Sequence, residues 1–265
     1  NLVDLGKEAS TGRFQAGFLG MAQQMLERQD SPYYEMVRNA VTHTDRQRIK
    51  TFGINFGWNC LTAGAHQIRT LEQERRHNIP WSLTLHMVDA PGGLTQDGYL
   101  SLIRQGNDLG IYAYFLFPDG TGNTVGSALA LAQQAEGSVF FLFLPAGWDP
   151  AELSPPDNMM IGVSCDGEGW RAAAERLRDK ACLYGLYRTY STSGEAEDII
   201  SGRWVEQALP YAGVGTMCLA GPGCPQALQD QVYQYVLDAR LGQRYPTLLV
   251  DFYRDVLYAD VCISD

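Results

Sequence analysis

The sequence predicts an α/β fold: a partial (β/α)6-type barrel of parallel strands with an N-terminal helical segment. Two observations support this prediction. From about residue 80 onwards, short apolar stretches alternate with helix-like stretches, a pattern typical of parallel strands joined by helical crossovers. Before that point, apolar residues recur at helical spacing. We therefore divide the chain into a helical segment, residues 1–78, packed on a barrel formed by residues 79–265.

Three helical stretches are expected in the first segment. Apolar residues recur at helical spacing over Gly17–Leu26. Ser31-Pro32 indicates a helix start, with an N-cap followed by proline at the first helical position. Asp45 opens a third stretch, which contains Phe52–Trp58. The alternation in Phe52–Trp58 fits a strand or a glycine-softened helix, and we favour the helix.

The barrel prediction depends on a series of strand and helix candidates of matching length. The strand candidates are Trp81–Met87, Tyr112–Phe117, Val139–Leu144, Met159–Ser164, Leu183–Tyr190, Val214–Leu219 and Thr247–Phe252. Helix-like stretches lie between them, near 95–109, 124–135, 168–181, 195–209 and 225–240. Short aromatic and aliphatic strands alternating with helices predict a parallel sheet buried on both faces. Ligand sites in such folds gather at the carboxyl ends of the strands.

Composition and charge narrow the classes of partner. The net charge of −10 and the pI of about 4.8 disfavour a phosphate-binding surface, so we expect no nucleic-acid partner. No apolar run approaches the roughly 18–20 residues that span a bilayer, so we expect no membrane partner. The first residues do not form a signal peptide. Since the chain begins at Asn1 and ends abruptly at Asp265, we interpret it as a fragment of a longer protein.

The cysteines and histidines indicate a reducing, cytoplasmic location and no metal centre. None of the six cysteines forms a CxxC pair, and a chain of this length does not need disulfides. We expect Cys165, Cys182 and Cys218 to be small buried apolar residues. The four histidines show no HExxH or paired spacing.

Polar residues and glycine at the predicted strand ends are the candidate ligand-binding residues. They are Asp89, Asp119, Gly120, Ser164, Asp166 and Arg188. Asp119 and Asp166 each precede a glycine, so they are either turn residues or acceptors for an amino or hydroxyl group of a ligand. Arg188 either binds a carboxylate or phosphate, or forms an ion pair with Glu195 or Glu197.

Other residues near the strand ends have simpler interpretations. His86 is either a general base or a core histidine bonded to a backbone carbonyl, and we favour the core histidine. The stretches Gly120–Gly122 and Gly221–Gly223 fit neither the P-loop nor the dinucleotide-binding pattern, so we interpret them as turns. We name no catalytic residue.

The order of these segments resembles the radical S-adenosylmethionine (SAM) superfamily over residues 31–265. Asn78–Leu83 looks like the family's entry into its first strand, and Thr95–Tyr112 is similar to its first helix and second strand. Ile161–Gly167 resembles its fourth strand, which ends in a Ser-x-(Asp/Glu)-Gly turn. Asp251–Asp255 and Asp260–Ile263 resemble a late strand and the approach to a C-terminal cysteine.

Two departures from the family pattern bear on activity. The family places CxxxCxxC after its first strand, to hold a four-iron cluster that binds SAM; the corresponding loop here, Val88–Gly93, contains no cysteine. The family's Gly-Gly-Glu turn after the second strand is replaced by Pro118–Gly122.

Three functional hypotheses follow. The first, favoured by the altered Pro118–Gly122 turn, is a degenerate member that lost the cluster and binds a small molecule or a protein partner. The second is an active radical SAM enzyme whose cluster loop is missing near Asp89–Pro91, which would need SAM and a 4Fe-4S cluster. The third is an unrelated (β/α) hydrolase or lyase that uses Asp119 and Asp166. The sequence leaves the oligomeric state open.

Overall fold

The computed structural model describes residue 28 and residues 30–264. The predicted helix at Gly17–Leu26 lies outside the described residues. In the described part, the predicted helical segment is confirmed and comprises α3, α4, the π-helix η1 and α5 in succession. Their bounds are Tyr33–His43 for α3, Arg46–Ile54 for α4, Asn55–Gly64 for η1 and Ala65–Arg75 for α5. Phe52–Trp58 is helical, as predicted.

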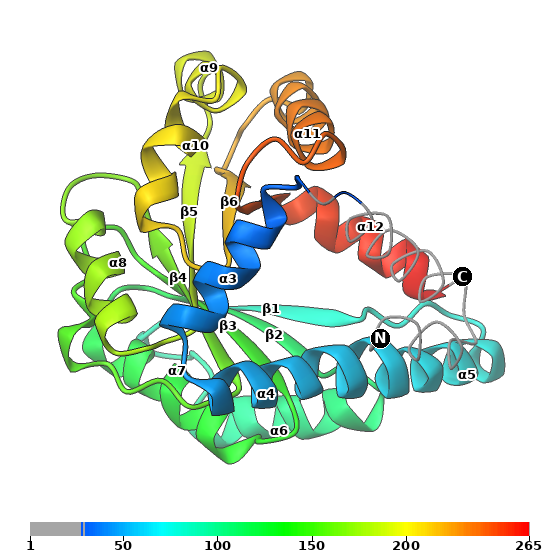
Figure 1. Cartoon of the computed structure of the whole chain (residues 1–265). Helices are drawn as coiled ribbons and strands as arrows, with labels where there is room; N and C mark the ends of the chain where they lie inside the picture. The colour runs from blue at the N-terminus through cyan, green and yellow to red at the C-terminus, as the bar shows by residue number, and fades with distance from the viewer. Residues whose placement is uncertain (1–27, 29, 265) are drawn as a thin grey trace.

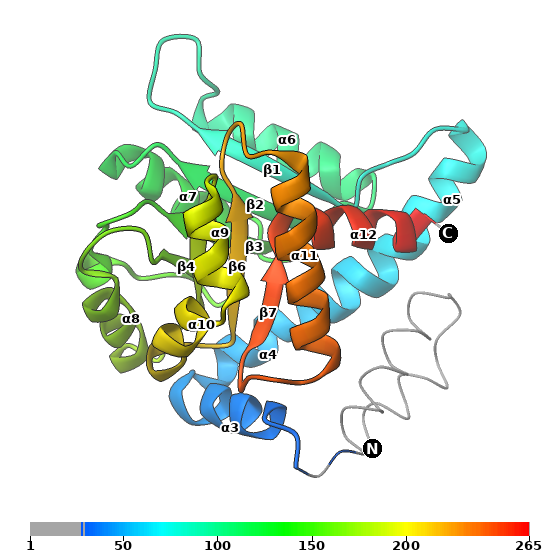
Figure 2. The same cartoon turned by 90° about the horizontal axis from the view of Figure 1, so that it is seen from above.

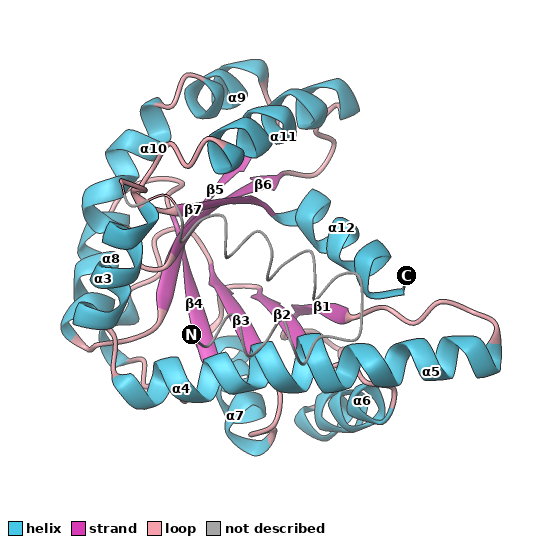
Figure 3. Ribbon diagram, turned by 45° about the vertical axis from the view of Figure 1, so that its right-hand side comes forward, coloured by secondary structure: helices cyan, strands magenta, loops and turns pink. Residues whose placement is uncertain are grey.

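Seven parallel strands form one sheet in consecutive order, which confirms the predicted α/β class and parallel topology. The strands are β1 (Ser82–Met87), β2 (Ala113–Pro118), β3 (Val139–Leu144), β4 (Met159–Ser164), β5 (Tyr184–Tyr190), β6 (Gly215–Ala220) and β7 (Leu248–Asp251). The sheet curls into a half-barrel with an open side between β1 and β7 (Figure 3).

The crossover helices cover the outside of the half-barrel (Figure 1). They are α6 (Gln96–Asp108), α7 (Gly122–Gln134), α8 (Trp170–Asp179), α9 (Ser193–Ile200), α10 (Arg203–Ala208) and α11 (Gln226–Leu241). The stretch predicted as one helix near 195–209 is therefore two helices. In the described part of the chain, no helix is both long enough and apolar enough to span a membrane.

The two faces of the sheet carry different aromatic residues because neighbouring side chains of a strand alternate in direction. Tyr114 faces outward: its ring stacks on Phe140, and its hydroxyl donates to the Ile103 carbonyl of α6 at 3.0 Å. Phe115 faces inward and lies 4.8 Å from Phe141, between ring centroids. Strand residues therefore fill cores on both faces.

The N-terminal helices share the main hydrophobic core with the sheet. Phe52 and Phe56 both make edge contacts with Phe141 on the inner face. The Asn55 side chain, which is buried, donates to the carbonyl oxygens of Glu136 and Ser138. These bonds tie the start of η1 to the turn before β3.

The end of the chain differs from the prediction. Asp251–Asp255 and Asp260–Ile263 were compared with a late strand and an approach to a cysteine, but the strand ends at Asp251. Helix α12 spans Phe252–Ser264. It begins directly after β7 and runs across the open side of the half-barrel towards α5 (Figures 1 and 2). Its apolar residues recur at helical spacing, and burial of Phe252 against the sheet fixes its start.

Candidate ligand-binding site

At the ends of β1 and β2, Asp119 is a structural residue that joins two loops. Its carboxylate accepts hydrogen bonds from the Asp89 backbone N–H at 2.9 Å, from the Thr121 N–H at 3.0 Å, and from the hydroxyls of Thr121 and Thr124. Asn123 donates to the Asp89 carboxylate at 2.8 Å. The structure thus brings Asp89 and Asp119 together, but through bonds within the loops.

These bonds make Asp119 sensitive to acid. The N–H groups of Asp89 and Thr121 hold the pKa of the Asp119 carboxyl well below its usual range. A lowered pKa gives stabilisation that is complete above the unfolded-state value of 3.8 and is lost as the pH falls below it.

We expect Asp119→Asn to lower the thermal midpoint at pH 7, because an amide offers one acceptor oxygen where two are used. The difference from the unmodified protein should narrow as the pH falls below about 4. Thermal unfolding at pH 3, 5 and 7 measures this. Asp89→Asn is the matched control, since that carboxylate accepts the single bond from Asn123. Equal midpoints for both variants at pH 7 would contradict the structural role of Asp119.

Gly120 belongs to the same turn. Its φ of +94° lies in the left-handed region, which a glycine adopts without steric cost. Added atoms at its Cα would approach the Pro145 ring at 3.5 Å. This position is therefore explained by the turn after β2 and by its neighbour after β3.

A second group of predicted residues lies at the ends of β4 and β5. The Asp166 carboxylate accepts from the Thr189 N–H at 3.2 Å and from the Ser164 hydroxyl at 3.3 Å. The Ser164 hydroxyl in turn accepts from the Asp166 N–H at 3.2 Å. The two residues form a closed turn, and Ser164 is buried.

Arg188 does not join either group. Its side chain forms an ion pair with Asp198 of α9, with Nη1 2.8 Å from Oδ2, so the expected pairing with Glu195 or Glu197 is wrong. Glu195 instead caps α9 by accepting from the N–H groups of Ser191 and Thr192. Arg188 alternates along β5 with the inward-facing Tyr187, so it lies on the outer face.

The favoured interpretation of His86 is also wrong, because this side chain is exposed. Its ring stacks on Phe117 with centroids 5.3 Å apart, and Phe117 stacks on Phe143 at 4.3 Å. His86 sits on the edge strand β1, where no further strand covers it. The row of rings leads from this edge into the inner face.

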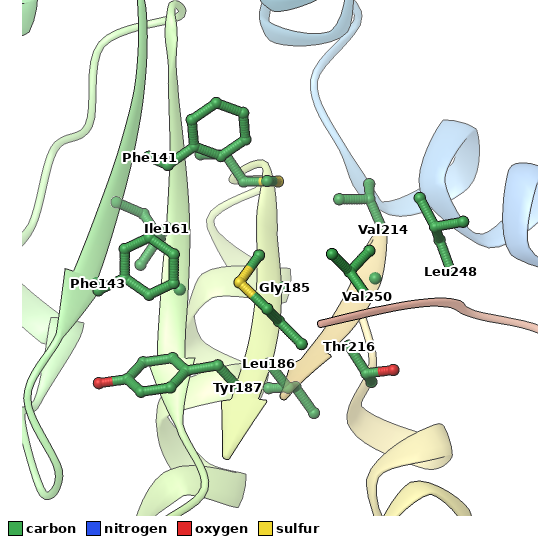
Figure 4. A pocket seen from close by; sticks show the side chains of 14 residues that line it. Phe141, Phe143, Ile161, Gly185, Leu186, Tyr187, Val214, Thr216, Leu248 and Val250 are labelled. Carbon is green, nitrogen blue, oxygen red and sulfur yellow. The ribbon is translucent and has the colours of Figure 1, made fainter. Parts of the chain in front are cut away.

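The inner face of the half-barrel contains an apolar cavity of about 110 Å³ that is only partly enclosed (Figure 4). Its walls are side chains of β3 to β7. They are Phe141, Phe143, Met160, Tyr187, Met217, Leu248 and Val250, with Gly162, Gly185 and Gly215 between them. No Asp, Glu, Lys, Arg or His lines it.

Three glycines on neighbouring strands create this hollow. Gly162 pairs with Gly185 across β4 and β5, and a Cβ on Gly162 would contact the rings of Phe143 and Tyr187 at 3.2 and 3.4 Å. A Cβ on Gly185 would lie 2.9 Å from the Gly215 carbonyl oxygen. Because the sheet curls, inner-face atoms of adjacent strands approach closely, and only glycine fits.

The single titratable group on the cavity wall is held neutral. Tyr187 donates its hydroxyl to the Leu144 carbonyl at 2.7 Å, and burial raises its pKa to about 12. Its ring remains available as an apolar wall. The cavity thus offers shape and apolar contact to a ligand and no charge.

The residues at the strand ends do not fit a four-iron cluster, which needs three thiolates that share one loop in the family pattern. The loop between β1 and α6 has none. Cys165 and Cys224 lie at the ends of β4 and β6, and burial raises the pKa of each, that of Cys165 to about 12. Among the described residues, no three His, Cys, Asp or Glu side chains are placed to hold a metal ion.

Sequence reasoning missed the cavity because it looked for polar residues at strand ends. The signal was present as glycines inside apolar strands, at Gly162 and Gly185, where glycine marks a close approach. Their alignment across strands required the register. Comparisons with family models, curated proteins and solved structures found no match for this chain.

Proposed function

We propose that this protein is a radical-SAM-like half-barrel that binds a small apolar molecule in the inner cavity and performs no cluster chemistry. One observation carries the proposal: the cavity between β3 and β7 has an apolar wall and a glycine floor. The strand-end carboxylates of Asp119 and Asp166 already accept bonds from their own turns.

The size of the cavity sets the class of ligand. A dry cavity of about 150 Å³ lined by aliphatic and aromatic residues binds benzene, and about 110 Å³ here is comparable. The ligand would therefore insert a ring or a short branched chain. Met160 and Met217 line the cavity and are only partly buried, so their flexible side chains can adjust to it.

We expect fluorobenzene to bind in the cavity and Val250→Phe to weaken this binding by about tenfold or more, because the added ring fills the space. Fluorine NMR line broadening measures the affinity. Val41→Phe, on the exposed face of α3, is the matched control and should bind as the unmodified protein does.

The charged analogue 4-fluorobenzoate gives a second control. It should bind about tenfold more weakly or less, since no cation on the cavity wall offsets the loss of carboxylate hydration. Equal binding of both probes, or unchanged binding in Val250→Phe, would reject the cavity as the site.

Reconstitution with iron and sulfide tests the absence of cluster chemistry. We expect no brown species absorbing near 400 nm and no stoichiometric iron, because the β1–α6 loop lacks thiolates. The intact mass of the expressed protein should equal 29.3 kDa. A larger mass with about four bound irons per chain would support the active enzyme instead.

A further inference from the structure

An apolar surface runs from the end of α11 along α12, and we call it the β7–α12 face. It consists of Leu241, Leu248, Tyr253, Leu257 and Val261, which are 72%, 37%, 45%, 59% and 56% exposed. Exposed apolar side chains that cluster in this way usually mark a surface that another segment or molecule covers.

The α12 part of this face is a regular stripe. Tyr253, Leu257 and Val261 follow at intervals of four residues, so they share one side of the helix. The other sides are already used: Phe252 and Ile263 are buried, and Asp255 pairs with Arg240 of α11. The stripe meets the inner face where the rings of Tyr253 and Phe252 lie 5.0 Å apart.

The described chain starts beside this face. Arg28 donates from Nη1 to the Gly242 carbonyl at 3.0 Å, and the Tyr33 hydroxyl donates to the Arg240 carbonyl at 3.3 Å. Gly242 follows Leu241 and precedes Leu248 by six residues, a span of at most about 20 Å. Residues preceding Arg28 therefore enter next to the β7–α12 face.

The sequence before Arg28 carries a matching apolar pattern. Phe14, Phe18, Met21 and Met25 follow at spacings of four, three and four residues, which is the stripe of an amphipathic helix. A helix over these twelve residues would be about 18 Å long, enough to cover the stripe from Tyr253 to Val261, about 12 Å along α12.

We propose that residues 14–25 pack their apolar stripe on the β7–α12 face of the same chain and so cover the open side of the half-barrel beside the cavity. This inference goes beyond the proposed function and does not depend on a ligand. Attachment at Arg28 favours this occupant over a second copy of the chain, because a tethered segment has a high effective concentration.

Hydrogen exchange of the full-length protein without ligand tests the proposal. In Phe18→Asp, amides of residues 241–261 should exchange about tenfold faster or more. Gln23→Asp adds the same charge on the opposite side of the predicted helix and should leave exchange unchanged. Thermal midpoints show that both variants remain folded. Equal exchange in the two variants would overturn the proposal.

A photo-crosslinker at position 18 identifies the occupant. Benzoylphenylalanine in place of Phe18 should form crosslinks to residues 241–261 within one chain, recovered as monomer. Recovery of the crosslinked peptides mainly as dimer would assign the face to a second copy and overturn the intramolecular packing. Because neither experiment contains ligand, its failure leaves the fluorobenzene test unaffected.

Discussion

Replacing Phe252 with alanine is expected to lower the free energy of unfolding by about 3–5 kcal/mol, as is typical for a buried aromatic side chain. Phe252 is 2% exposed, and its ring makes edge contacts with Phe115 at 4.9 Å and Phe143 at 5.4 Å. It is the first residue of α12, so the same change should loosen the helix that crosses the open side.

Denaturant unfolding measures this effect, and two variants serve as controls. Phe252→Leu keeps most of the apolar volume and should cost less than about 1.5 kcal/mol. Val37→Ala, on an exposed position of α3, should change stability by less than about 0.5 kcal/mol. A loss below about 1 kcal/mol for Phe252→Ala would contradict the anchoring of α12 by this ring.

Asp251 is expected to give the second large effect, because it is a buried carboxylate with two structural partners. It is 1% exposed. Its Oδ1 accepts from the Arg254 N–H at 3.1 Å, which caps the start of α12, and its Oδ2 accepts from the Tyr190 hydroxyl at 3.1 Å. Asp251→Ala removes the cap and leaves the Tyr190 hydroxyl unpaired, which should cost about 2–4 kcal/mol.

The pH dependence separates the charge of Asp251 from its hydrogen bonds. Burial raises the pKa of Asp251. A raised pKa means that the stabilisation is complete below the unfolded-state value of 3.8 and is lost as the pH rises through the folded-state value. Asp251→Asn keeps an acceptor for Arg254 and carries no charge.

We therefore expect Asp251→Asn to match or exceed the unmodified protein in stability at pH 7, and to lose the advantage near pH 4. Denaturant unfolding at pH 4, 5.5 and 7 measures both variants. If Asp251→Asn were as destabilised at pH 7 as Asp251→Ala, the ionised carboxylate would be required, and burial would not be the dominant influence.

Prediction from sequence was accurate for the strands, since each is a short run of residues suited to burial on both sides. Val139–Leu144 shows this, because every residue of the strand is buried. The C-terminal helix was missed because Asp251–Asp255 was interpreted by resemblance. Its helical spacing, with Tyr253, Leu257 and Val261 exposed, was present in the sequence.

The roles of the strand-end residues depended on partners that the sequence does not reveal. Asp119 looked equally suited to a turn or to a ligand until the structure placed the Asp89 N–H against its carboxylate. Arg188 was expected to pair with a glutamate, but the position of α9 brings Asp198 to it. Side chains on adjacent turns of one helix point in different directions, so a few residues of sequence distance do not identify a partner.

By itself, the sequence determined the strand–helix alternation, the parallel sheet buried on both faces, and the absence of thiolates after β1. These properties depend on local composition. Only the tertiary structure decided that Gly162, Gly185 and Gly215 form one floor, and that Asp251 is buried beside Tyr190. Both results depend on the register and curl of the sheet, which bring together residues that are far apart in the chain.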